Sequence, residues 1–100
     1  MITIKAKRAK NLKEKIVGLI NRDSPENLVI KTHFGIHTFL MKFPIDVIIL
    51  DNKNNVIALK ENLKPNRIFL WNPKYEIVVE CRLGLIKKKG IKKGDTIKIS

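Results

Sequence analysis

The stretch of residues 32–51, THFGIHTFLMKFPIDVIILD, constrains the fold more than any other part of the chain. From residue 37 onward it alternates with the two-residue period of a β-strand. One face of this predicted strand carries His37, Phe39, Met41 and Phe43. Pro44 has no N–H to donate to a neighbouring strand, so it separates this strand from the next one. The second strand, residues 45–50, is apolar on both faces apart from Asp46, and we therefore predict that it is central and covered on both sides.

Asp46 is the most informative single residue, because a carboxylate in an apolar strand is costly unless it is hydrogen-bonded or paired. Two interpretations are open. The carboxylate accepts hydrogen bonds from the backbone N–H groups of a turn, or it pairs with His37, Arg67 or a ligand. Glu80 raises the same question, since it also lies among apolar neighbours. For Glu80 the simpler expectation is a salt bridge to Arg67 or Arg82.

One hundred residues suit a single domain, residues 1–100, with one compact core. We predict a mostly-β α+β fold, a compact β-sandwich or barrel-like domain of about six to eight short strands with one N-terminal helix. The helix is predicted to begin after Asn11, which can cap it together with Glu14. Strands are predicted at residues 2–5, 28–32, 37–43, 45–50, 56–59, 67–71, 75–81 and 96–99. A sandwich and a barrel would both hide the strand edges, so the choice between them stays open.

Residues 37–47, HTFLMKFPIDV, resemble the signature of the domain of unknown function 192 family, also called uncharacterised protein family 0127. Further segments follow in the order that this family shows. They are Gly18-Leu19 before the signature, then Leu50-Asp51 with Val56, Leu63-Lys64-Pro65 with Arg67, Val79-Glu80 with Gly84, and Gly90-Ile91 with Gly94-Asp95. The resemblance covers nearly the whole chain and implies a compact sandwich or barrel, but no established activity. The chain departs from many relatives in its short Met-Lys-Phe-Pro form before Asp46.

Cys81 is the only cysteine, so no internal disulfide can form and a reducing compartment is expected. It shares a predicted strand face with Ile77 and Val79, which favours a small core residue over a nucleophile. No apolar run approaches the ~20 residues of a membrane helix, and the N-terminus lacks the apolar region of a secretory signal. We therefore expect a cytoplasmic protein without a membrane span. The Lys-, Ile- and Asn-rich composition also fits a genome bias or a hot habitat.

The two histidines, His33 and His37, have the i, i+4 spacing of helical metal sites, but this segment is predicted to be extended. In a strand they would lie roughly 13 Å apart, too far to share one zinc ion. We expect no metal site and no cofactor, since the glycines at 90 and 94 lack the Lys-Ser/Thr ending of a phosphate-binding loop. For His37 two interpretations are open: a buried neutral imidazole, or a general base or anion-binding group at a cleft.

The positive charge of the chain is concentrated at its two ends. Residues 1–22 hold seven basic residues and one acid, residues 23–81 hold seven of each, and residues 82–100 hold seven basic residues and one acid. The net charge of +12 therefore comes entirely from the ends. If the fold brings the ends together, they form one positive face that attracts phosphate backbones. This candidate nucleic-acid patch comprises Lys7, Arg8, Lys10, Lys87, Lys88, Lys89, Lys92 and Lys93.

Three classes of function are compatible with these patterns. The first is a binding or accessory module for an anionic or other small ligand, since polar groups set in apolar strands are typical of ligand pockets. Its predicted pocket is lined by His37, Met41, Phe43, Asp46, Arg67 and Glu80. The second is a nucleic-acid-binding protein that uses the Lys-rich ends. The third, an enzyme with a His37/Asp46 acid–base pair, has the least support, because no nucleophile, metal set or cofactor loop accompanies the pair.

Overall fold

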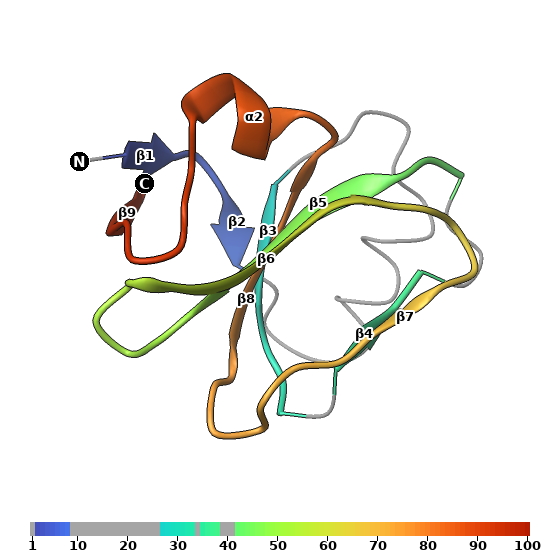
Figure 1. The fold of residues 1–100 in the computed structure, drawn as a ribbon, viewed down its shortest axis with the longest axis horizontal. Coiled ribbons are helices and arrows are strands. Elements are labelled where there is room, and N and C mark those ends of the chain that lie inside the picture. Colours follow the sequence, from blue (N-terminus) through green and yellow to red (C-terminus); the bar gives the residue numbers. More distant parts are fainter. Residues whose placement is uncertain (1, 9–26, 34, 39–41) are drawn as a thin grey trace.

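The computed structural model describes residues 2–8, 27–33, 35–38 and 42–100 (Figure 1). Within these residues the chain forms short strands and one short helix, so the mostly-β α+β prediction is confirmed. The strands are β1 (Ile2–Ile4), β2 (Lys7–Arg8), β3 (Leu28–Lys31), β4 (Ile36–His37), β5 (Ile45–Leu50), β6 (Val56–Leu63), β7 (Ile68–Phe69), β8 (Ile77–Arg82) and β9 (Ile97–Ile99), and the helix is α2 (Leu85–Lys89). The predicted helix after Asn11 lies outside the described residues.

The centre of the molecule is a five-stranded sheet in the order β2-β3-β8-β5-β6. Strand β8 is antiparallel to both β3 and β5, and β5 and β6 form the antiparallel hairpin that the sequence predicts. All six residues of β5 are buried, which confirms that this strand is covered on both sides. Among the described strands, β2 and β6 are the two edges of this sheet.

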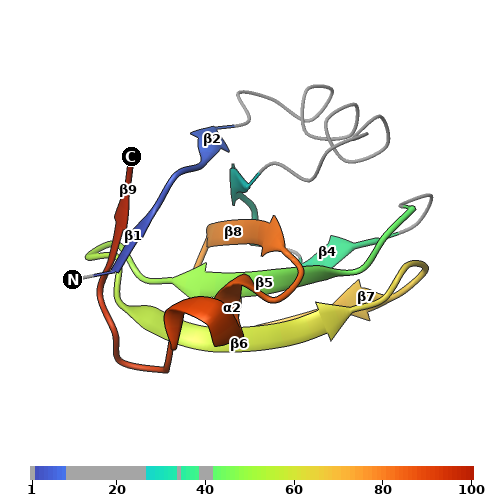
Figure 2. The same cartoon turned by 90° about the horizontal axis from the view of Figure 1, so that it is seen from above.

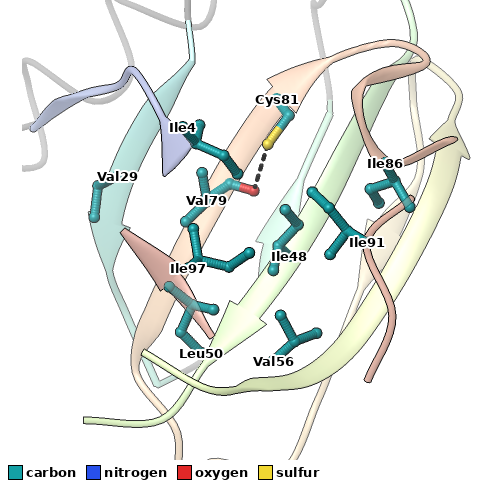
Figure 3. Close-up of a cluster of buried hydrophobic side chains, with 10 residues drawn as sticks. All are labelled: Ile4, Val29, Ile48, Leu50, Val56, Val79, Cys81, Ile86, Ile91 and Ile97. Carbon is teal, nitrogen blue, oxygen red and sulfur yellow. Dashed lines mark hydrogen bonds between the residues drawn. The ribbon is translucent and has the colours of Figure 1, made fainter. Parts of the chain in front are cut away.

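Each face of the central sheet carries its own apolar core, because successive side chains of a strand point to opposite faces. On one face Ile48 and Leu50 of β5 pack with residues of β1, α2 and β9, as Figure 3 shows. On the other face Val47 and Ile49 pack with residues of β4 and β7. We call these the α2 face and the β4–β7 face. In Figure 1 the strands of the central sheet lie between the two covering layers.

The two ends of the chain meet in a parallel strand pair on the α2 face. Ile2 of β1 lies opposite Ile97 of β9, and Ile4 lies opposite Ile99. The backbone N–H of Ser100 donates to the carbonyl of Ile4 at 3.0 Å. Figure 2 shows β1 and β9 side by side, with the two termini in the same region of the molecule.

Strand β6 runs four residues beyond the predicted end at residue 59. The sequence that follows, Lys60-Glu61-Asn62, is polar and suggests a turn. In the structure β6 is an edge of the sheet, where charged side chains face solvent and are compatible with a strand. Strand β7 is shorter than the predicted strand at 67–71. Of the predicted strand at 37–43, only His37 is in β4, and residues 39–41 lie outside the described residues.

Gly35 is required where the chain enters β4. Its φ is +88°, and a Cβ there would meet the side chain of Leu70 and the carbonyl oxygen of Phe69, the latter at 2.9 Å. We expect Gly35→Ala to lower the free energy of unfolding by about 2 kcal/mol or more, from backbone strain and displacement of β7. Gly94→Ala is the matched control, since Gly94 has φ +93° but no atom within 4 Å of a Cβ. Urea denaturation should show a loss of only about 1 kcal/mol for Gly94→Ala, and equal losses would contradict the contact with Phe69.

Candidate functional site

Asp46 is fully buried, and three backbone N–H groups surround its carboxylate. Its Oδ1 accepts a hydrogen bond from the N–H of Asn62 at 3.0 Å. Its Oδ2 accepts from the N–H of Gly84 at 3.0 Å and from that of Ile86 at 3.1 Å. Such bonds satisfy the acceptor oxygens of a carboxylate that is removed from water. The interpretation in which Asp46 accepts backbone hydrogen bonds is therefore confirmed, and the carboxylate ties β5 to the end of β6 and to the start of α2.

The two buried carboxylates lie on opposite faces of the central sheet. Asp46 alternates with Val47 along β5 and so shares the α2 face with Ile48. Glu80 of β8 lies opposite Val47 of β5 in the strand register, and Val47 belongs to the core of the β4–β7 face. Because residues directly opposite each other share a face, Glu80 points to the β4–β7 side. Asp46 and Glu80 therefore do not line the same cavity.

Thr38 is a buried polar residue that the sequence analysis did not single out. Its Oγ1 donates a hydrogen bond to the carbonyl of Lys64 at 2.6 Å and accepts one from the N–H of Arg67 at 2.9 Å. The backbone of Thr38 also donates to the carbonyl of Arg67 and accepts from Asn66. These bonds fasten the signature strand to the turn at residues 64–67. In the sequence, the sign that Thr38 is buried is that its hydroxyl lies on the same predicted strand face as the apolar Leu40.

His37 is exposed, so of the two interpretations of this residue the buried imidazole is wrong. The reason is that β4 packs on one side only: Ile36 faces the core opposite Phe69, while His37 lies opposite the exposed Ile68. Arg67 directly precedes Ile68 and is also exposed. The backbone of Arg67 pairs with that of Thr38, so Arg67 lies beside the β4–β7 strand pair that carries His37.

Phe43 packs against the core of the β4–β7 face and is half-buried. Four of the six residues predicted to line a pocket are on this side of the sheet, namely Phe43, His37, Arg67 and Glu80. Asp46 is on the other side, and Met41 lies outside the described residues.

A pocket of about 230 Å³ lies where β5 ends at Leu50 and β8 begins at Ile77. It is lined by His33, Leu50, Asp51, Asn52, Lys74, Tyr75, Glu76 and Ile77, none of which was a predicted site residue. His33 is held by the carbonyl of Pro73 at 2.7 Å and by the carboxylate of Glu76 at 2.9 Å. A backbone hydrogen bond from Asn55 lowers the pKa of Asp51 below its ordinary value. These bonds hold the turns that surround the pocket.

Nine of the described basic residues near the two ends lie on or beside the layer that covers the α2 face. We call this set the basic layer: Lys5, Lys7, Arg8, Lys87, Lys88, Lys89, Lys92, Lys93 and Lys98, all of them exposed. Lys10 lies outside the described residues. Strand pairing joins β1 to β9, and Ile86 of α2 packs in the same core as Ile4 and Ile97. Asp95 is the only acid in residues 82–100, and its Oδ2 accepts from the N–H of Lys92 at 2.8 Å.

Cys81 is fully buried in the core of the α2 face, 3.7 Å from the carbonyl oxygen of Val79, which confirms it as a core residue (Figure 3). Among the described residues, no three His, Cys, Asp or Glu side chains are grouped as a metal ion would require. In the same part of the chain, no helix has the length and apolar character needed to cross a membrane.

These features define a small β-rich α+β domain whose central sheet is held by buried polar anchors and flanked by a basic layer. The family model of domain of unknown function 192 (DUF192, uncharacterized ACR) matches residues 2–99, and the chain belongs to this family. A search of the curated proteins finds no match.

Two solved structures share the fold. One is a protein of unknown function from Novosphingobium aromaticivorans DSM 12444, with a TM-score of 0.78 and 21% identity over 91% of this chain and 71% of that one. The other is described as a proposed transcription regulator from Sinorhizobium meliloti 1021, with a TM-score of 0.73 and 17% identity over 91% of this chain and 78% of that one. At these identities the likeness concerns the fold alone.

Proposed function

We propose that this protein is a small binding or accessory domain that binds nucleic acid through its basic layer. The observation that carries the proposal is the parallel pairing of β1 with β9, which joins the two chain ends. Their neighbourhood holds the nine exposed cations of the basic layer, whereas residues 23–81 are neutral in total charge. A positive surface of this kind attracts a polyanion over a distance of about one Debye length, roughly 8–10 Å in physiological salt.

Phosphate contacts would supply most of the affinity, because each neutralised phosphate releases condensed counterions. The affinity is then expected to fall steeply with salt. A protein with six to ten such contacts loses roughly 10³- to 10⁵-fold between ~50 and ~200 mM salt. The basic layer offers a comparable number of exposed cations.

Fluorescence anisotropy of labelled nucleic acid, titrated with the protein between ~50 and ~300 mM salt, tests this proposal. The test variant replaces Lys87, Lys88 and Lys89 by glutamine. We expect it to weaken binding and to make the slope of log K against log salt shallower by about 2 to 3, since each lost contact contributes about 0.9.

The matched control replaces Lys42, Lys60 and Lys74 by glutamine, which removes the same charge from exposed positions outside the basic layer. The proposal requires the control to keep a slope close to that of the wild type. Equal losses in the two variants, or no binding by the wild type at ~150 mM salt, would overturn it.

A second candidate site surrounds β4 and β7 and corresponds to the predicted pocket residues His37, Phe43 and Arg67. It is favoured by the register that sets His37 opposite the exposed Ile68, next to Arg67. Glu80, which points to the same side of the central sheet, would support this surface from within rather than contact a ligand, whereas Asp46 lies on the α2 face. A thermal-shift screen of small anions against the wild type and the Arg67→Ala variant tests it. A shift that survives Arg67→Ala would count against this site.

An acid–base pair of His37 and Asp46 receives no support from the geometry. The Asp46 carboxylate accepts three backbone N–H groups on the α2 face, whereas β4 packs on the opposite face of the sheet. Binding rather than catalysis is therefore the function that we propose.

A further inference from the structure

We infer that the preferred partner is a double-stranded nucleic acid, contacted through its phosphates without reading of the bases. This inference rests on the proposed function and names the form of nucleic acid that the basic layer fits. Three observations lead to it: where the aromatic residues are, which side chains the layer offers, and how the charge density of a duplex compares with that of a single strand.

The described aromatic side chains are separated from the basic layer by the central sheet. Residues 1–33 and 76–100, which contain every residue of the basic layer, have no Phe, Tyr or Trp. Those that the structure describes, Phe43, Phe69, Trp71 and Tyr75, pack against the core of the β4–β7 face. Proteins that bind single strands stack unpaired bases on aromatic rings. The basic layer offers no such platform, so unpaired bases would gain little from it.

The side chains of the layer suit phosphates better than base edges. Eight of its nine cations are Lys and one, Arg8, is Arg. Lys acts as a compact point charge, whereas the planar guanidinium of Arg is the group that most often reads guanine. Asn and Gln, which read adenine, are absent from residues 82–100. The described helix that carries three of the lysines, α2, has only five residues, which is short for a helix that reads bases in a groove. The layer is therefore suited to binding that is independent of base sequence.

A duplex presents more charge to a rigid cationic surface than a single strand does. Double-stranded DNA carries one negative charge per ~1.7 Å of its axis, and its salt slope is ~0.9 per phosphate against ~0.7 for a single strand. For six contacts at ~0.1 M salt this difference amounts to roughly tenfold in affinity. The described part of the molecule measures 32 × 28 × 23 Å. Even its shortest dimension spans about six full base pairs at ~3.4 Å each.

The test uses the full chain at ~100 mM salt and compares four labelled probes of about 12 nucleotides or base pairs. They are duplex DNA of two unrelated sequences, duplex RNA of the first sequence, and single-stranded oligo-dT. We expect at least one duplex type to bind roughly tenfold more tightly than oligo-dT. The two DNA sequences should agree within about twofold, since no base contacts discriminate them.

The possible failures are distinguishable. Oligo-dT binding as tightly as every duplex, or a large preference between the two DNA sequences, would overturn the duplex inference and leave nucleic-acid binding in place. Absence of binding to all four probes would overturn both the inference and the proposed function. Vesicles with anionic lipid serve as the competing polyanion, and binding to them alone would likewise overturn both.

Discussion

Replacing Asp46 with alanine is expected to lower the free energy of unfolding by about 3–5 kcal/mol. The substitution leaves three N–H groups, those of Asn62, Gly84 and Ile86, without the acceptor that now serves them. A buried donor that loses its partner costs about 1–3 kcal/mol. These donors come from the end of β6 and from the start of α2, so the loss should loosen both elements. For a domain with a total stability of about 5–15 kcal/mol, this is a large fraction.

Urea denaturation followed by circular dichroism measures this effect, with two companion variants. Asp46→Asn keeps one acceptor oxygen but no charge, and its amide group would face a donor, so an intermediate loss of about 2 kcal/mol is expected. Glu61→Ala removes an exposed carboxylate from the neighbouring strand β6 and should change stability by less than ~0.5 kcal/mol. A loss below ~1 kcal/mol for Asp46→Ala would show that the carboxylate does not anchor β6 and α2.

Replacing Thr38 with valine should cost about 2–3 kcal/mol, although the two side chains have nearly the same shape. The hydroxyl donates to Lys64 and accepts from Arg67 in a fully buried site. Valine fills the same space but leaves a carbonyl and an N–H unsatisfied. The turn at residues 64–67 would lose its attachment to β4, which also holds the exposed pair His37 and Ile68.

Thr38→Ser is the matched control, because it keeps the hydroxyl and removes one methyl group, worth about 0.8 kcal/mol. Amide hydrogen exchange provides a local readout in addition to the denaturation midpoint. The Arg67 N–H should exchange faster in Thr38→Val than in Thr38→Ser. If the two variants had the same stability and the same Arg67 exchange rate, the hydroxyl would not be the group that fastens this turn.

The sequence predicts the parts of this fold that local patterns determine. Residues 45–50 are apolar on both faces, and the structure covers β5 on both faces. The Asp- and Asn-rich turn at 51–55 predicts the β5–β6 hairpin, which the structure contains. The alternation of residues 75–81 likewise assigns Val79 and Cys81 to one face of β8 and Val78 to the other, as observed.

The relative placement of different strands was not predictable in the same way. Alternation shows which residues of one strand share a face, but strand register decides which faces of two strands agree. Asp46 lies opposite Cys81, and Glu80 lies opposite Val47. A shift of one residue would have put the two carboxylates on the same face. The pairing of β1 with β9 joins residues almost a full chain length apart, and no local pattern in either segment specifies it.

The pairing of β1 with β9 also brings described cations from both ends of the chain into one region of the molecule. In the sequence the two basic segments could have lain on opposite sides of the molecule as solvated surface. In the structure the core of the α2 face contains Ile4 from one end and Ile86 and Ile97 from the other. Burial of these apolar residues, rather than attraction between charges, therefore holds the cations near one another against their mutual repulsion.

The central claim, that the basic layer is the binding surface, is tested most directly by nuclear magnetic resonance. Amide chemical shifts of the full chain would be followed while duplex DNA is added at ~100 mM salt. We predict that the shifted amides belong to β1, β2, α2 and β9 and to the loop containing Lys92 and Lys93, while those of β4 and β7 stay in place. Shifts concentrated at His37, Arg67 and Ile68, with the amides of Lys87 to Lys89 unchanged, would contradict the claim and identify the β4–β7 pair as the binding surface.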